Sequence, residues 1–171
     1  MKITLRIWRQ PAADQPGRYE RHGLADVSPD VSLLEALDQL NEQLISAGKR
    51  PVSFEHDCRE GICGSCGFLV NGQAHGPRRA TSVCQLYLRE FEDGAELTLE
   101  PWRAKAFPAI QDLMVDRSSL DRLIAAGGYC STGTGQAPDG NALPVGRDQA
   151  TSAFSTATCI GCGACVASCR N

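Results

Sequence analysis

The sequence predicts an α+β fold in which several short strands pack against one main helix. Two alternating segments near the N-terminus, one strongly amphipathic helical segment and a later hairpin pattern carry this prediction. The chain has 171 residues, of which 42% are apolar and 22% are charged. That length suffices for one ordinary domain and part of another, and the composition is typical of a globular protein.

The N-terminal segment is predicted to form an antiparallel pair of strands. Lys2 to Trp8 alternates apolar and polar residues, and Arg18 to Val27 resembles a second strand. Between them, Gln15-Pro16-Gly17 is a turn signal. The N-terminus lacks the apolar core of a signal peptide, and no stretch approaches the length of a transmembrane helix. Any association with a membrane is therefore expected to come through partner proteins.

The clearest helix is predicted to begin after Ser32. Ser32 and Glu35 have the spacing of a capping box, in which each side chain accepts a bond from the other residue's backbone N–H. Gly48 stands where a glycine commonly ends a helix. The apolar residues in between share one face: Leu33, Leu37, Leu40 and Leu44. The pattern predicts a helix that packs on the sheet by this face.

Further strands are predicted after the helix. Val52 to Glu55 is expected to be a short strand leading toward the first cysteine. Phe68 to Val70 and Gln73 to His75 are expected to form a hairpin around Asn71-Gly72, a dipeptide that favours a tight turn. Glu96 to Glu100 alternates like one more strand of the sheet.

The second half of the chain is predicted to be mainly helical. A helical stretch through Ile110, Leu113 and Met114 is expected after Phe107-Pro108, and Ser119 to Ala126 is expected to be a short helix that stops at a Gly-Gly pair. Residues 128–146 are rich in Gly, Thr, Pro and Asn and are expected to form a long loop. A weak helix around Gln149 to Ala157 leads into the last cysteines.

Four cysteines carry the strongest chemical signal. They read C-x4-C-x2-C followed by a lone cysteine, which is the plant-type spacing for a [2Fe–2S] cluster: Cys58, Cys63, Cys66 and Cys84. Glycines among them permit a positive φ and a close approach of backbone N–H groups to sulfur: Gly61, Gly64 and Gly67. Because such a centre passes one electron at a time, the predicted function is electron transfer.

A second cysteine set has the C-x2-C-x2-C-x3-C run of bacterial ferredoxins: Cys159, Cys162, Cys165 and Cys169. In this run the first three cysteines serve one [4Fe–4S] cluster, and the fourth serves another cluster. Neither cluster can be completed from the rest of the chain, so the polypeptide is expected to continue further. Arg170 follows the last cysteine, where the usual run has proline.

Simpler uses of these residues stand beside iron–sulfur binding. The total of nine cysteines is odd and no signal pattern precedes them, which favours metal ligation in a reducing compartment over disulfides. Zinc is the alternative metal, since thiolates suit zinc as well as iron. Cys130 is expected to be a free thiol. The histidines are expected at the surface: His22, His56 and His75.

Three segments together identify the family that this chain resembles. They are HDCREGICGSCG at 56–67, FPAIQDLMVDRSSL at 107–120 and CIGCGACVASC at 159–169. With both cysteine patterns in this order, the chain resembles the iron–sulfur subunit of succinate dehydrogenase and fumarate reductase, the respiratory complex II family. The resemblance implies an N-terminal β-grasp [2Fe–2S] ferredoxin-like domain over residues 1–104, followed by the start of an α-helical ferredoxin-like domain over residues 105–171.

The resemblance also implies which cysteines hold which cluster. The [2Fe–2S] cluster would be held by the first set, Cys58, Cys63, Cys66 and Cys84. The [4Fe–4S] cluster would take three ligands from this chain, Cys159, Cys162 and Cys165. Cys169 would be the first ligand of a [3Fe–4S] cluster, and the remaining family ligands lie beyond residue 171.

By the same resemblance, this chain relays single electrons between the FAD of a flavoprotein subunit and a membrane quinone. It carries no substrate site and works as a subunit of succinate:quinone oxidoreductase or fumarate reductase. Its implied partners are that flavoprotein and the membrane anchor subunits. Nucleic acid is not among them, since a net charge of −3 offers no basic field. The implied location is the cytoplasmic face of a bacterial cell membrane, reached through the partner subunits.

Other functions remain open on the residues alone. A free-standing soluble ferredoxin-type carrier is one, although residues 102–158 would have no purpose in it. An iron–sulfur subunit of a molybdenum hydroxylase is another, but it needs a C-x-C pair that this sequence lacks. A structural or regulatory zinc protein is the third.

Residues around the first cysteine loop are predicted to tune its cluster. Ser65 and the amides near Gly61 and Gly64 are expected to donate to sulfur and so set the reduction potential. Arg59 and Glu60 flank the loop with opposite charges, which are expected to offset each other at long range.

Overall fold

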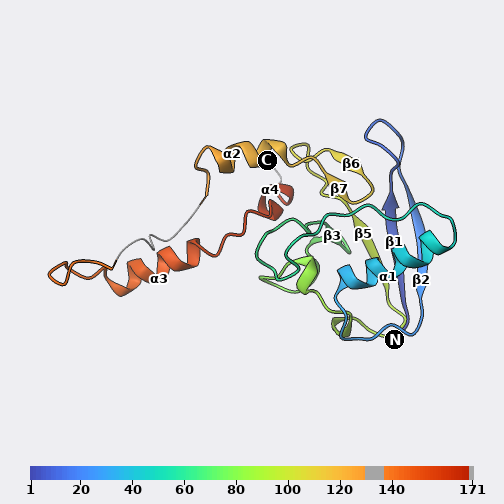
Figure 1. The fold of residues 1–171 in the computed structure, drawn as a ribbon, viewed down its shortest axis with the longest axis horizontal. Coiled ribbons are helices and arrows are strands. Elements are labelled where there is room, and N and C mark those ends of the chain that lie inside the picture. Colours follow the sequence, from blue (N-terminus) through green and yellow to red (C-terminus); the bar gives the residue numbers. More distant parts are fainter. Residues whose placement is uncertain (130–136, 170–171) are drawn as a thin grey trace.

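The computed structural model describes residues 1–129 and 137–169. Its main unit is the predicted α+β fold, a five-stranded mixed sheet with one long helix across its face (Figure 1). The strand order is β2-β1-β5-β3-β4. The elements of this unit are Ile3–Arg9 (β1), Arg18–Leu24 (β2), Leu33–Ser46 (α1), Leu69–Val70 (β3), Gln73–Ala74 (β4) and Glu96–Glu100 (β5).

β1 lies inside the sheet, because both of its edges are paired. It runs antiparallel to β2, with Ile3 opposite Leu24, and parallel to β5. Every second residue of β1 is buried, which is the pattern of a strand with one face in the core. The predicted N-terminal strand pair is confirmed, with β2 ending at Leu24 rather than Val27.

The predicted helix is confirmed together with its capping box. Ser32 Oγ accepts a bond from Glu35 N at 3.2 Å, and the Glu35 carboxylate accepts one from Ser32 N at 2.6 Å. Gly48 takes a φ of +65° just beyond the helix end. The helix face against the sheet is fully apolar: Leu33, Leu34, Ala36, Leu37, Leu40 and Leu44. Each fully buried leucine contributes roughly 1.5–3 kcal/mol to folding.

The β3–β4 hairpin turns where the sequence predicts it. Asn71 and Gly72 have φ values of +52° and +76°, the signature of the tight turn that suits twisted strands. Two short 3-10 turns follow, Val83–Gln85 and Leu88–Glu90, which the sequence patterns do not predict. The first of them contains the lone cysteine of the first set.

The predicted strand over Val52 to Glu55 is wrong, because the backbone there bonds to side chains and to the turn residue Leu113 instead of a neighbouring strand. The Asn41 amide bonds both the N–H and the carbonyl of Val52, at 2.7 and 2.9 Å. Ser53 N donates to the Asp112 carboxylate at 3.0 Å. These two side chains come from distant parts of the chain, so a local pattern cannot reveal them.

The predicted helix through Ile110, Leu113 and Met114 is also wrong. The segment is a small hairpin of Ala109–Gln111 (β6) and Met114–Val115 (β7). Asp112 sits at its turn with a φ of +47° and is completely buried. Its carboxylate pairs with the guanidinium groups of Arg9 and Arg50, at 3.3 and 2.8 Å. These buried ion pairs stabilise the hairpin, although the apolar residues around Asp112 have helical spacing.

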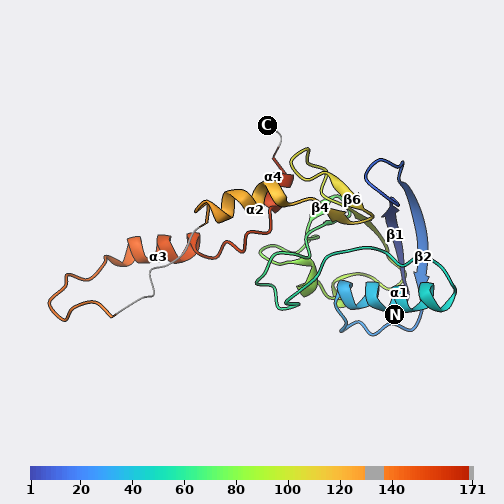
Figure 2. The same ribbon diagram turned by 45° about the horizontal axis from the view of Figure 1, so that its top comes forward.

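Three helices complete the second region: Ser118–Ala125 (α2), Arg147–Thr156 (α3) and Ala164–Ala167 (α4). The predictions of a helix near 119–126 and another near 149–157 are confirmed with small shifts, and α4 is new. None of these helices contains a buried residue. α3 lies farthest from the sheet, and α4 returns beside α2 (Figures 1 and 2).

A small second core joins this region to the sheet. Trp102, Phe107 and Val115 are buried together, and side chains of β3, β4, α2 and α4 pack around them. In the predicted loop over 128–146, residues 137–146 precede α3 without helix or strand, and Cys130 lies outside the described residues. Among the helices that are described, none has the length and apolarity needed to cross a membrane.

Candidate iron–sulfur sites

The first cysteine loop lies between α1 and β3 and supplies three of the four cysteines. The 3-10 turn Val83–Gln85, which follows β4, supplies the fourth. Cys66 and Cys84 are only 3% and 4% exposed and belong to the main core. Cys58 and Cys63 are partly exposed. One side of the site is therefore embedded in the sheet domain while the other side faces outward.

Burial and hydrogen bonding shift the pKa values of two thiols of this loop in opposite directions. The backbone N–H of Glu60 is the main cause that lowers the pKa of Cys58 to about 6, and the side chain of Cys63 adds to it. Burial raises the pKa of Cys66 to about 11, and the thiol beside it is that of Cys84. Cys63 also raises the pKa of Cys66, so the exposed and the buried thiols of the loop influence one another.

A single-ion site is not formed by the side chains that the structure describes. Within residues 1–129 and 137–169, no three His, Cys, Asp or Glu side chains gather around one point.

Hydrogen-bond donors surround the sulfur atoms. Glu60 N donates to Cys58 Sγ at 3.3 Å. Ser65 approaches Cys63 Sγ with both its backbone N, at 3.5 Å, and its hydroxyl, at 2.9 Å. Such donors stabilise negative charge on thiolate sulfur. The predicted placement of Ser65 and of loop amides against sulfur is confirmed.

Two of the three loop glycines have the backbone conformation that the sequence predicts. Gly61 and Gly64 take φ values of +77° and +74°, which disfavour any residue with a Cβ. Gly67 is required for a different reason. A Cβ added there would lie 2.5 Å from the ring of Trp102.

Several residues that shape this site are missed by sequence reasoning. The hydroxyl of Ser82 lies 3.2 Å from Cys84 Sγ, in the buried half of the site. Arg59 pairs with Asp38 of α1 at 2.5 Å rather than with Glu60. A serine two residues from a ligand cysteine is the only local signal for Ser82, and nothing local indicates Asp38.

The histidines follow the prediction only in part. His56 is exposed beside the loop, as expected. His75 is 6% exposed and its ring stands edge-on to Trp102 at 5.4 Å, so the expected surface position is wrong. The physical reason is that the β3–β4 hairpin turns this side chain toward the second core rather than toward water.

The second cysteine run lies against the first loop but is less embedded. Cys162 is half-buried, and the other three cysteines of the run are exposed: Cys159, Cys165 and Cys169. A Cβ added to Gly64 would lie 2.7 Å from the carbonyl oxygen of Ile160 and 2.9 Å from Cys162 Cα. The backbones of the two loops thus touch. The structure does not bring three thiols of this run to one point.

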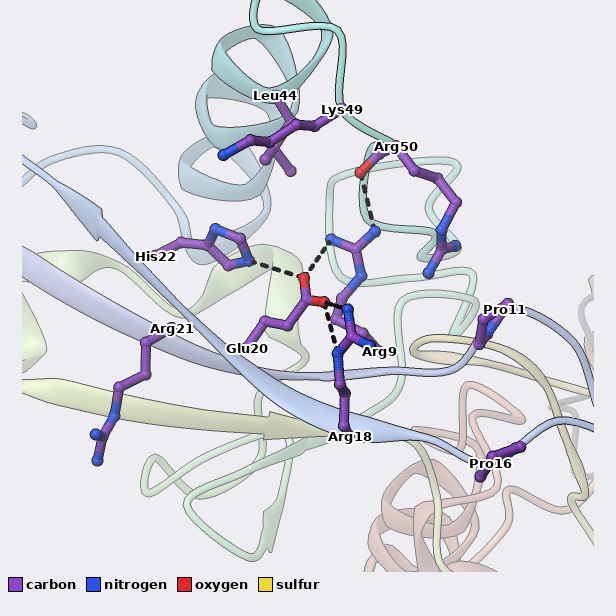
Figure 3. A pocket seen from close by; sticks show the side chains of 10 residues that line it. All are labelled: Arg9, Pro11, Pro16, Arg18, Glu20, Arg21, His22, Leu44, Lys49 and Arg50. Carbon is purple, nitrogen blue, oxygen red and sulfur yellow. Dashed lines mark hydrogen bonds and ion pairs between the residues drawn. The ribbon is translucent and has the colours of Figure 1, made fainter.

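A separate basic hollow lies at the other end of the sheet, between β1, β2 and the end of α1 (Figure 3). Glu20 points into it toward Arg9, Arg18 and His22, at 3.9, 2.8 and 3.7 Å. Its guanidinium groups are paired with carboxylates, and none of its lining residues is cysteine. This hollow is therefore distinct from the cluster sites.

The fold and the first loop define a class of protein, a plant-type [2Fe–2S] ferredoxin domain that is followed by a ferredoxin-type cysteine run. The chain belongs to the family of 2Fe-2S iron-sulfur cluster binding domains, which matches residues 4–122. This membership confirms the predicted [2Fe–2S] cofactor.

Relatives support the predicted resemblance over nearly the whole chain. The succinate dehydrogenase iron-sulfur subunit of Bacillus subtilis is 29% identical over 99% of this chain. The fumarate reductase iron-sulfur subunit of Wolinella succinogenes is 27% identical over 98% of it. This chain spans 64% and 66% of the length of those two relatives. The names of these relatives confirm the predicted resemblance to the iron–sulfur subunits of succinate dehydrogenase and fumarate reductase.

A solved structure shows the same fold. A chain of the Mycobacterium smegmatis Sdh1 complex in the apo form superposes with a TM-score of 0.71 at 20% identity. The match covers 98% of the present chain and 63% of that chain. The arrangement of sheet, hairpin and C-terminal helices is therefore shared with a chain of that complex.

Proposed function

We propose that this chain is the electron-transfer iron–sulfur subunit of a succinate dehydrogenase or fumarate reductase complex. It passes single electrons between the FAD of a flavoprotein subunit and a membrane quinone. The contact between the two cysteine loops carries this proposal. Gly64 of the first loop lies against Ile160 and Cys162 of the second, so two cluster sites are built side by side on one chain.

We assign the ligands by set. The [2Fe–2S] cluster is held by Cys58, Cys63, Cys66 and Cys84. Three ligands of a [4Fe–4S] cluster are Cys159, Cys162 and Cys165, and Cys169 is the first ligand of a [3Fe–4S] cluster. The other ligands come from outside residues 1–171. The first set belongs to a domain over 1–104 and the second to a helical domain that begins at 105.

When bound, each cluster accepts and releases one electron without making or breaking covalent bonds to substrate. The residues of this chain have the remaining tasks. The hydroxyls of Ser65 and Ser82 and the N–H of Glu60 stabilise negative charge on sulfur. Cys66 and Cys84 keep the inner half of the first site away from water, which limits side reactions at that half.

The proposed partners are a flavoprotein subunit and membrane anchor subunits. We place succinate or fumarate chemistry on the flavoprotein subunit and quinone chemistry beside membrane anchor subunits. The whole complex then holds this chain peripherally at the cytoplasmic face of a bacterial membrane. Apolar side chains that stand in solvent on the second region support such partners, and they include Leu123, Leu143 and Phe154.

Co-purification tests the proposal. The full natural polypeptide is tagged and isolated from its own cells, and its FAD, iron and acid-labile sulfide are measured. We expect an FAD-containing subunit to come with it, and succinate to reduce the [2Fe–2S] signal seen by electron paramagnetic resonance. The Cys66→Ser variant is the control that should lack this signal. A protein that is isolated alone and reduced only by a soluble reductase would instead be a ferredoxin-type carrier.

A further inference from the structure

Arg117 lies between the two cysteine loops and bonds to both. Its Nη1 donates to the carbonyl oxygen of Gly64 at 2.7 Å, and its Nη2 donates to that of Gly161 at 2.6 Å. Gly64 stands between Cys63 and Cys66, and Gly161 stands just before Cys162. One guanidinium fork therefore spans the backbone beside the ligands of both predicted clusters.

The hydrogen bond from Arg117 to Gly161 connects two stretches of the chain. Across the two described stretches, it is the one hydrogen bond that joins residues 137–169 to residues 1–129. The other contacts between these stretches are close packing without a hydrogen bond, such as that of Gly163 against Phe107 and of the Ile160 and Cys162 backbone against Gly64. Such packing is not directional, so the guanidinium supplies the directional part of this junction.

Arg117 is itself held firmly. It follows the β6–β7 hairpin and directly precedes α2. Its preceding neighbour, Asp116, donates its N–H to the carbonyl of Pro108 at 2.8 Å and accepts the N–H of Ser118 at 2.8 Å. The backbone is thus fixed on both sides of the arginine, so its side chain points to the loops from a defined base.

The guanidinium of Arg117 also places a positive charge beside the first cysteine loop. The hollow that contains Arg117 is lined by Cys63 and Ser65, and Arg117 is the one basic residue in its lining. Three carboxylates share that lining: Glu55, Asp116 and Asp121. Because reduction adds a negative charge to a cluster, a fixed positive charge near its ligands favours the reduced form.

We propose that Arg117 is a positioning residue that sets the contact between the two cysteine loops and places a positive charge between their clusters. This role rests on the proposed function, since it presumes that the second run also holds a cluster. Lysine could keep the charge but has no planar fork for two carbonyls. Glutamine would keep neither the charge nor the reach.

Three variants of the full natural polypeptide separate the effect of the positive charge of residue 117 from the effect of its two hydrogen bonds: Arg117→Gln, Arg117→Lys and Arg122→Gln. Arg122 is the matched control, because it is an exposed arginine of α2 whose side chain, among the described residues, bonds to Ser119 and to neither cysteine loop. Two quantities are measured in each protein. They are the midpoint potential of the [2Fe–2S] centre and the amide hydrogen exchange of residues 61–66 and 159–163.

We expect Arg117→Gln to lower the midpoint potential and to speed exchange in both loops. Arg117→Lys should keep the potential close to wild type and speed exchange in residues 159–163. Arg122→Gln should match wild type in both measurements. Equal results for Arg117→Gln and Arg122→Gln would overturn the proposal. If Arg117→Gln fails to fold, wild-type exchange in Arg117→Lys overturns it as well.

Failure of the proposed function would look different. A wild-type protein with a [2Fe–2S] spectrum but no second cluster, or with no flavoprotein partner, would count against that function. The two carbonyls that Arg117 binds belong to the backbone of this chain and do not require a second cluster or a partner. The hydrogen exchange of both loops and the [2Fe–2S] potential can therefore still be measured in such a protein.

Discussion

The two cysteine loops have equally recognisable spacing, but their cysteines differ in burial and in the side chains that pack against them. In the first loop, Cys66 and Cys84 belong to the main core, and serine hydroxyls contact sulfur in both halves of the site. In the second run three of four cysteines are exposed, and the surrounding helices bury no residue fully. Ligand spacing is thus a property of the sequence, whereas preorganisation of a site depends on what packs behind it.

The contrast has a physical origin. The first loop is bounded by elements that already have a core of their own, because α1 and the sheet bury a continuous apolar face. Among the described residues, the second run touches this unit at the small core around Phe107, at the Arg117 fork and at the backbone of Gly64. Variants that act on one loop and spare the other therefore test the comparison directly.

The largest effect is expected from exchanging one ligand in each loop. Cys66→Ser removes a buried thiolate, so we expect complete loss of the [2Fe–2S] absorption and of its paramagnetic signal. Cys165→Ser removes an exposed thiol of the second run and should leave both features of the first cluster unchanged. Visible spectra and iron content of the two variants measure this. Loss of the first cluster in Cys165→Ser would mean that both loops fold as one unit.

Asp112→Asn should destabilise the first region most among variants that spare all cysteines. Asp112 is fully buried and neutralises Arg9 and Arg50, so its loss leaves the buried Arg9 with the more distant Glu20 as its remaining carboxylate partner. We expect a loss of about 3–5 kcal/mol in the free energy of unfolding, measured by chemical denaturation. The exposed Asp14→Asn is the control and should change that free energy by less than about 0.5 kcal/mol. A similar result for both variants would contradict a structural role of the Asp112 ion pair.

Gly64→Ala tests the contact between the loops, and Gly72→Ala is its matched control. Both glycines have a positive φ, so each alanine costs about 1–2 kcal/mol in backbone strain. At Gly72 nothing lies within 4 Å of an added Cβ, whereas at Gly64 it would meet the backbone of Ile160 and Cys162. We expect the Gly64 variant alone to speed hydrogen exchange in residues 159–163. Equal exchange in both variants would contradict the close contact.

His75→Phe probes the second core, which joins the two regions. Burial lowers the pKa of His75, so the folded protein keeps this ring neutral while the unfolded chain binds a proton below about pH 6.5. Stability is therefore lost as pH falls below that value, with a slope of up to ~1.4 kcal/mol per pH unit from this residue. The phenylalanine variant should show a shallower decline between pH 7 and 5 in denaturation experiments. Equal slopes would contradict a neutral buried histidine.

Ser65→Ala should have the smallest effect, with no change in fold. Removing a hydroxyl donor from Cys63 makes the added charge of the reduced cluster less favourable, so the midpoint potential should fall. A loss of about 1 kcal/mol corresponds to roughly 40 mV for one electron. Ser82→Ala removes a donor from the buried Cys84 and should lower the potential further, because a buried bond is stronger. A redox titration that shows no shift in either variant would remove the serines from this role.

The elements that the sequence predicts correctly are those whose signal is local. The alternation of β1, the capping box at Ser32 and the turn at Asn71-Gly72 each depend on residues a few positions apart. The two failures share the opposite property. Val52 to Glu55 and the stretch from Ile110 to Met114 are both shaped by one buried carboxylate, Asp112, whose partners lie some sixty to one hundred positions away.

The candidate sites divide in the same way. The first cysteine set, Ser65 and the need for positive φ at Gly61 and Gly64 are readable in the sequence, because they follow from spacing. Ser82, the pairing of Arg59 with Asp38 and the reach of Arg117 across both loops are not. Those contacts join segments that only the folded chain brings together. The assignment of individual ligands to clusters stays a prediction.

The order of residues by itself determined which atoms can bind iron and which short segments form strands, turns and the main helix. These properties follow from covalent spacing and local backbone preference. Tertiary structure alone decided that Cys66 and Cys84 lie in the core, that Asp112 ends a would-be helix, and that the two loops touch. The reason is that burial and ion pairing are collective, since each depends on every segment that closes around the group.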